Sequence, residues 1–257
     1  MAPVAVRQEV ARVRAALAAW GTVTMVGLLG GGNRTTAVAV RRGQERLVAH
    51  LSRRSPAGLD WQVKLVGHLA GHGLVVPAVV PAQDGRYHVD GVTVERWLDG
   101  RVPGDADWPA VVAALRRLHE VTAGWPQRPG FAATRELLTR ERGGDVDLSL
   151  MPADAVAGCR HAWAGLAAGP QTVVHGDPGP PNIRITSDGV GLLDWDEARV
   201  DHPDLDLADL PAEVLPPARL AAARLAVRAW EAASGWVTEP SYARHQLALL
   251  RRAGNAP

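Results

Sequence analysis

The first hundred residues alternate between short apolar runs and breaks rich in glycine or charge, a pattern typical of β-strands joined by turns. Apolar, β-branched runs at 23–29 and 35–40 predict two strands, and residues 46–51 predict a third. In the third run, the two-residue period places Val48 and His50 on the same face of the sheet. The pattern therefore predicts a small, mostly β N-terminal region.

A helix and a hairpin complete this region. Apolar residues recur at helical spacing from 59 to 69 and predict a helix after the third strand. The runs 85–89 and 91–95, which are separated by a single Asp, predict two antiparallel strands. The segment 95–100 that follows them is either the end of an ordinary strand or a connection between two lobes.

Beyond residue 105 the apolar spacing becomes helical. It predicts helices at 108–119 and 153–168, and a charged, exposed helix end at 135–142 that is broken by two glycines. Residues 211–252 are rich in Ala, Leu and Arg, and they predict two closing helices that are separated near Ser234. The C-terminal part of the chain is therefore expected to be mostly helical.

A second predicted hairpin brings two polar side chains together. Residues 183–186 and 190–193 predict two strands joined around the Asp-Gly pair at 188–189, a strong turn signal. Because a hairpin returns the chain, Asn182 and Asp194 are expected side by side at its open end. Two oxygen ligands that meet in this way are what magnesium coordination requires.

Composition limits the classes of protein that fit. The chain has 257 residues, of which 47% are hydrophobic and 21% charged, with a formal net charge of +1. That balance gives no global field for nucleic acid or an anionic membrane, so neither is an expected partner. Cys159 is the only cysteine, and residues 7–14 read as an amphipathic helix rather than a signal segment. No apolar run approaches the ~20 residues of a membrane span. We therefore expect a cytoplasmic enzyme, and the sequence indicates no oligomeric state.

The segment 173–197 carries the clearest chemical signal. It reads His-Gly-Asp-x-x-Pro-x-Asn at 175–182 and Leu-Leu-Asp-Trp at 192–195. This pair of motifs resembles the aminoglycoside phosphotransferase and choline kinase group of small-molecule kinases. Protein kinases proper carry Arg in place of Gly176 and Phe-Gly in place of Trp195-Asp196.

The resemblance implies an α+β, bilobal, protein-kinase-like fold, with a nucleotide-binding lobe at 1–98 and a catalytic, acceptor-binding lobe at 99–257. It implies ATP and Mg²⁺ as cofactors, with Asn182 and Asp194 holding the metal and Asp177 orienting and deprotonating the acceptor hydroxyl. The acceptor would be a small molecule such as an aminoglycoside-like antibiotic. The alternatives are a metabolic kinase for choline- or homoserine-like alcohols and a pseudokinase that binds nucleotide without turnover.

The resemblance also assigns a nucleotide site. A glycine cluster between the first two strands would cover the phosphates, although such glycines can simply form a turn. One apolar residue of the third strand would lie over the adenine, and backbone groups of the segment between the lobes would bind its edge. The residues in these roles are Gly30, Gly31, Gly32, Asn33, Val48, His50, Arg96 and Leu98.

The nucleotide site departs from the family pattern at its cation. A lysine is expected where His50 stands, and the only lysine, Lys64, falls on the following helix. The expected Lys–Glu pair between strand and helix is replaced by His50 and Gln62. Either His50, Arg53 or Arg54 holds the phosphates, or the protein is a degenerate kinase.

Several further acidic side chains follow the motif. The resemblance implies that Asp206 braces the catalytic loop. Asp201 and Asp204 either face an acceptor pocket, where they would favour a cationic acceptor, or cap a helix. Asp196 is either a second acid facing the metal or a structural one, and His119 is expected to be a core histidine.

Overall fold

The computed structural model describes residues 4–30, 36–211 and 214–254, and the chain divides into two compact units. The first unit comprises residues 1–103 and 179–196, and the second comprises residues 104–178 and 197–257. The sequence suggested a single division between residues 98 and 99. Residues 179–196 belong with the first unit because their hairpin forms β-bridges to it, Val75 with Gly191 and Arg101 with Ile185.

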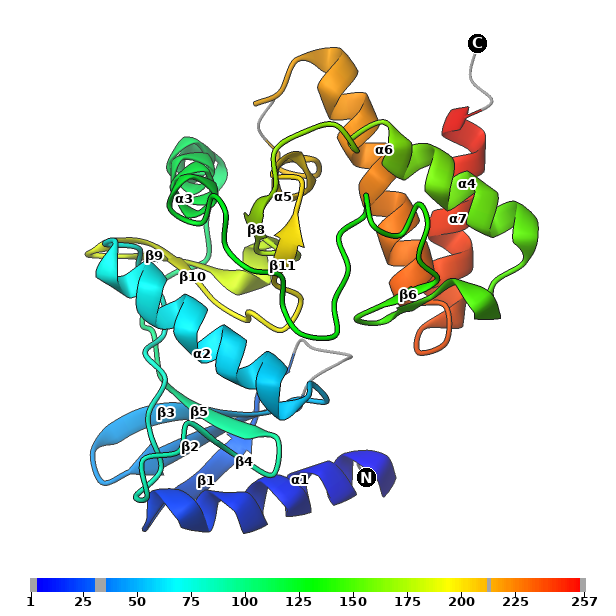
Figure 1. The fold of residues 1–257 in the computed structure, drawn as a ribbon. Coiled ribbons are helices and arrows are strands. Elements are labelled where there is room, and N and C mark those ends of the chain that lie inside the picture. The colour runs from blue at the N-terminus through cyan, green and yellow to red at the C-terminus, as the bar shows by residue number, and fades with distance from the viewer. Residues whose placement is uncertain (1–3, 31–35, 212–213, 255–257) are drawn as a thin grey trace. The chain divides into compact units, whose positions relative to one another are not determined.

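An antiparallel sheet forms the centre of the first unit (Figure 1). Its strand order is β1-β2-β3-β5-β4, and the predicted strands and hairpins are confirmed. The amide of Leu29 donates to the carbonyl of Ala37 at 2.9 Å, so the glycine segment does connect two paired strands. The strands are β1 Thr24–Leu28, β2 Thr36–Arg42, β3 Glu45–Leu51, β4 His88–Val89 and β5 Val92–Arg96.

The two helices of the first unit, α1 Val4–Ala16 and α2 Pro56–Gly71, lie on opposite faces of this sheet (Figure 1). The short 3-10 helix η1 Leu17–Trp20 continues α1. On β3, alternate residues from Leu47 to Leu51 are buried in a core with α1 and η1. Val48 and His50 therefore face the other way, which confirms the predicted period.

The second hairpin also lies in the first unit. The 3-10 helix η4 Pro180–Asn182 leads into β9 Ile183–Thr186, which pairs antiparallel with β10 Gly189–Leu192. Gly191 lies directly against the Leu98 side chain, because a Cβ atom there would lie 2.4 Å from Cδ2 of Leu98. This close approach seats the hairpin against the segment that follows β5.

The second unit is mostly helical, as predicted. Its core packs α4, α6 and α7 together and buries Cys159. The helices are α3 Trp108–Val121, α4 Ala153–Ala164, α5 Asp204–Leu207, α6 Pro217–Ser234 and α7 Pro240–Gly254, with 3-10 turns η2 Asp105–Asp107 and η3 Leu148–Leu150. The short strand pairs are β6 Arg142–Gly143 with β7 Val146–Asp147, and β8 Thr172–Val174 with β11 Arg199–Asp201.

One helical prediction was wrong. Residues 135–142 form turns followed by β6 rather than a helix end. Gly143 and Gly144 pack against residues 130–132, and the amide of Gly144 donates to the carbonyl of Gly130 at 2.7 Å. The turns themselves are closed by local hydrogen bonds, such as the one from the Arg140 amide to the Glu136 carbonyl at 2.9 Å. Over the described residues, the helices include none with the length and apolar character of a membrane span.

Candidate active site

The loop that carries Asp177 follows β8 in the second unit and is held by a buried carboxylate. Asp206, 1% exposed, accepts hydrogen bonds from the amides of His175 at 2.8 Å and Gly176 at 2.9 Å. It also pairs with Nε2 of His119 at 2.9 Å. Asp206 therefore braces the loop as expected, while Asp177 remains exposed at its end.

Electrostatics keep Asp206 in its charged form. Burial, the largest single effect, would raise the pKa of this carboxyl, and the hydrogen bond and charge of His119 are the main opposing effects. His175 and the Gly176 amide act in the same direction, so the net pKa of Asp206 is lowered. The ionised carboxylate can then accept all three hydrogen bonds, and His119 is a satisfied core histidine as predicted.

The residue before Asp177 has to be glycine. Gly176 has φ of +91°, and a Cβ atom there would lie 2.7 Å from the carbonyl oxygen of Glu197. A side chain would meet both the left-handed backbone strain and this backbone atom. This geometry excludes the arginine that protein kinases carry at the corresponding place.

The hairpin places Asn182 opposite Leu193, the residue before Asp194, within the first unit. The last β9–β10 pair is Ile183 with Leu192, and beyond it the Leu193 amide donates to the Asn182 carbonyl at 2.8 Å. Both predicted metal ligands are partly exposed, and Asp194 adopts φ of +59°, which is uncommon outside glycine. Asp177 belongs to the other unit.

The donor set at the hairpin fits magnesium. An amide oxygen and a carboxylate are hard ligands, and Mg²⁺ in nucleotide enzymes takes only one or two carboxylates besides water and phosphate oxygens. Within the described ranges, no three or more His, Cys, Asp or Glu side chains group as a metal site of the all-protein kind. A site completed by nucleotide phosphates would need no such group.

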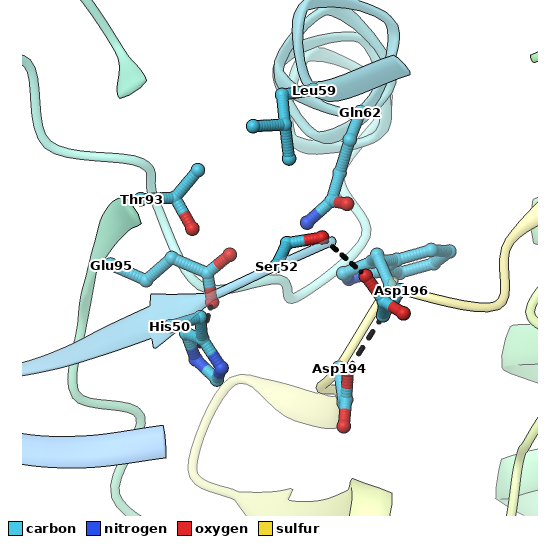
Figure 2. Close-up of a pocket in the computed structure, with 9 residues that line it drawn as sticks. His50, Ser52, Leu59, Gln62, Thr93, Glu95, Asp194 and Asp196 are labelled. Carbon is cyan, nitrogen blue, oxygen red and sulfur yellow. Dashed lines mark hydrogen bonds and ion pairs between the residues drawn. The ribbon is translucent and has the colours of Figure 1, made fainter. Parts of the chain in front are cut away.

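A pocket of the first unit connects the sheet to this hairpin (Figure 2). Side chains from β3, β5, α2 and the segment after β10 converge on it. Within it, Nε2 of His50 lies 3.6 Å from Oε2 of Glu95, and Ser52 donates to Asp196 at 2.8 Å. The residues that line it are His50, Ser52, Leu59, Gln62, Thr93, Glu95, Asp194, Trp195 and Asp196.

The three side chains that could replace the expected lysine differ in their surroundings. Arg54 is paired with Asp196 at 2.7 Å, with only 10% of its side chain exposed. Arg53 is exposed and pairs with Glu9 at 3.2 Å. His50 is the one of the three that lines the pocket. The ion pair with Arg54 favours the structural interpretation of Asp196, and Lys64 is exposed on α2.

In the segment predicted to bind the adenine, one backbone amide, that of Leu98, is available as a hydrogen-bond donor. The Arg96 amide donates to the Ala78 carbonyl at 2.9 Å, and its side chain pairs with Glu45 at 3.0 Å. The Leu98 amide donates to no other described residue. Val48 is half-buried on the same face as His50, and Gly30 is exposed. Gly31, Gly32 and Asn33 lie outside the described residues.

Two acids for which an acceptor role was one of two alternatives are internal. Asp201 is fully buried and accepts from Thr134 and from Arg199, the latter at 3.0 Å. Asp204 is buried and pairs with Arg219 at 2.7 Å. Because their charges are already compensated within the second unit, the interpretation of these acids as an acceptor pocket was wrong.

Sequence reasoning missed Glu95 as a pocket residue. The run Thr93-Val94-Glu95 contained the signal, because the two-residue period places Thr93 and Glu95 on one face. The strand register opposes Thr93 to His50 and Glu95 to Val48. Only this long-range pairing, which the sequence did not indicate, puts the acid beside His50.

Comparison with known proteins places these features in a family. A profile of the phosphotransferase enzyme family matches residues 26–246. No curated protein matches the chain. The family profile thus spans the glycine segment, the pocket, both motifs and most of the helical unit.

Solved structures share the fold over nearly the whole chain at low sequence identity. A microcompartment-associated aminopropanol kinase has a TM-score of 0.66 and 18% identity, over 95% of this chain and 97% of that one. An aminoglycoside phosphotransferase in its apo form has a TM-score of 0.64 and 16% identity, over 94% and 98%. A choline/ethanolamine kinase family protein from Mesorhizobium loti has a TM-score of 0.58 and 21% identity, over 98% and 96%.

Proposed function

Because the chain belongs to the phosphotransferase enzyme family, we propose that it transfers the γ-phosphoryl group of ATP to a hydroxyl group of a small molecule. The observation that carries this proposal is the hairpin, whose 2.8 Å bond from the Leu193 amide to the Asn182 carbonyl sets Asn182 opposite the residue that precedes Asp194. An amide oxygen and a carboxylate at adjacent positions are the protein ligands that a nucleotide-bound magnesium ion requires.

Each residue then has a defined task. Asn182 and Asp194 would hold magnesium, which when bound neutralises charge on the phosphate oxygens. Asp177 orients the acceptor hydroxyl and accepts its proton, from a loop whose backbone Asp206 fixes. The Leu98 amide is available to bind the edge of the adenine ring, and His50 faces the nucleotide pocket. The rate enhancement comes mainly from positioning, because phosphoryl transfer needs little covalent help.

We further propose that the acceptor carries an amine. Burial raises the pKa of the Glu231 carboxyl on α6, and the charges of Asp209 and Asp177 raise it further. The hydrogen bond from Tyr242 and the charge of Arg228 oppose this rise but do not cancel it. A cationic group on the acceptor would relieve this repulsion. Aminopropanol, ethanolamine and choline, named for two of the similar structures, are all alcohols with an amine or ammonium group. A further similar structure is a ternary complex of an aminoglycoside phosphotransferase with AMP-PNP and hygromycin B.

The test of the proposed base is Asp177→Asn. We expect ADP formation with an amino-alcohol acceptor to fall by about a hundredfold or more, because general-base assistance is lost. Nucleotide affinity, measured by calorimetry, should change little. Asp188→Asn, the same substitution in the exposed β9–β10 turn, is the control and should retain turnover. Full activity in Asp177→Asn would rule out the assigned base.

A second candidate function is nucleotide binding without turnover. The neutral Gln62 on α2, where the family pattern expects an acid, favours it. The two functions differ in one measurement, because a pseudokinase would bind ATP with magnesium but transfer no phosphate to any acceptor.

A further inference from the structure

Glu95 is a buried acid whose presence in the nucleotide pocket needs an explanation. Its residue is 5% exposed, and its carboxylate receives no hydrogen bond from another described residue. Among the described residues, the one ionisable group paired with it is His50, at 3.6 Å between Nε2 and Oε2 (Figure 2). A carboxylate held in this way is poorly compensated by the surrounding protein.

Such an acid costs stability. Burial raises the pKa of Glu95, Asp194 adds to that effect, and only His50 opposes it. Replacing a poorly compensated buried charge by a neutral group of similar shape is commonly neutral or stabilising. A purely structural role therefore does not account for a carboxylate at this place, whereas a functional role does.

The strand register shows what the carboxylate can act upon. Glu95 is opposite Val48, and His50 is opposite Thr93, so the acid and the imidazole project from neighbouring strands onto one face. The family pattern would instead supply an acid from α2, but that position holds the neutral Gln62. All four of these polar and titratable neighbours, His50, Gln62, Thr93 and Asp194, line the same pocket as Glu95.

We propose that Glu95 is a positioning residue that replaces the helix acid and holds the His50 imidazole toward the phosphates of the bound nucleotide. Only the effect of this pair on nucleotide binding rests on the proposed function, whereas the pairing of Glu95 with His50 does not. Both members of the His50–Glu95 pair then come from neighbouring strands of the sheet, β3 and β5. The site therefore does not need a charged side chain from α2. His50 and Glu95 then act as one unit in nucleotide affinity.

The pairing itself is tested without nucleotide. The ¹⁵N resonances of the His50 ring, assigned with a His50→Gln variant, are compared in wild type, Glu95→Gln and Gln62→Leu. We expect the His50 signals to move in Glu95→Gln and to move less in Gln62→Leu, because the charged partner is on β5. The reverse order would overturn the proposal, whatever the protein does with ATP.

The functional part is tested by the affinity for ATP and magnesium. We expect Glu95→Gln to weaken binding by about tenfold, a size typical of coupled neighbours. Its unfolding midpoint should be unchanged or higher, which separates this loss from misfolding. Glu120→Gln, on the exposed part of α3, is the matched control and should leave affinity unchanged.

A double-variant cycle makes the result specific to the pair. If Glu95 acts through His50, the losses in His50→Gln and Glu95→Gln will not add in the double variant. Additive losses, or unchanged affinity in Glu95→Gln, would overturn the proposal. Failure of the wild type to bind ATP would instead overturn the proposed function and the nucleotide part together, while the ring resonances still decide the pairing.

Discussion

At the scale of single residues, the conformation of the loop before the proposed general base requires a glycine. Gly176 combines φ of +91° with a backbone oxygen 2.7 Å from where a Cβ atom would stand. The conformation of the loop thus depends both on the absence of a side chain at Gly176 and on the hydrogen bonds that Asp206 accepts. This makes the geometry of Asp177 sensitive to the smallest possible substitution.

We predict that Gly176→Ala lowers the free energy of unfolding by about 1–3 kcal/mol, because the alanine must adopt a strained conformation or displace the Glu197 carbonyl. Turnover should fall further than stability alone explains, because Asp177 is the next residue. Urea unfolding and steady-state kinetics measure the two effects. Gly158→Ala on α4, where a Cβ atom meets nothing within 4 Å, is the control and should be neutral or slightly stabilising.

At the scale of elements, one carboxylate joins three parts of the second unit. Asp206 on α5 holds the loop after β8 and pairs with His119 on α3. The side chains of Asp206, His119 and His175 are all buried. The three elements therefore meet at one buried carboxylate. Its loss should therefore affect both the stability of this unit and the position of Asp177.

We predict that Asp206→Ala lowers the free energy of unfolding by about 3–5 kcal/mol at neutral pH, because it leaves buried donors unpaired. The folded pKa of Asp206 is lowered below the ordinary value of an aspartate, so its stabilising effect is complete above that ordinary pKa and is lost as pH falls through the folded pKa. Denaturation at several pH values should show the gap to wild type closing only in acid. Asp105→Ala, an exposed control, should show no such gap.

The elements themselves were largely predictable, because their signals are local. The two-residue period on β3, the Asp-Gly turn at 188–189 and the helical spacing after residue 105 all act within a few positions. The predicted hairpin is present and pairs Asn182 with Leu193, the residue before Asp194. The roles of these two residues and of Asp177 remain predictions.

What the sequence could not indicate depends on contacts between distant segments. Asp201 and Asp204 looked like free acids, but Thr134, Arg199 and Arg219 compensate them after folding. Gly143 and Gly144, which follow the turns at 135–142, pack against residues 130–132. Glu95 became a partner of His50 only through the β3–β5 register. Tertiary pairing, rather than local propensity, determined each of these outcomes.

At the scale of the whole molecule, the chain returns to its first unit for a short segment. Residues 179–196 carry both proposed metal ligands and pack against the segment that follows β5. The proposed base stays in the second unit with the acids Asp209 and Glu231. Nucleotide and metal are thus assigned to one unit, and the acceptor to the other.

The most direct test of this account is mass spectrometry of amino alcohols and their amine-free analogues after incubation with the protein, ATP and magnesium. We predict a phosphate-sized mass gain on the hydroxyl of an amine-bearing acceptor, slower gain on its amine-free analogue, and no gain with Asp177→Asn. Bound ATP with no phosphorylated product from any acceptor would contradict the account, because the site would then hold nucleotide without transferring from it.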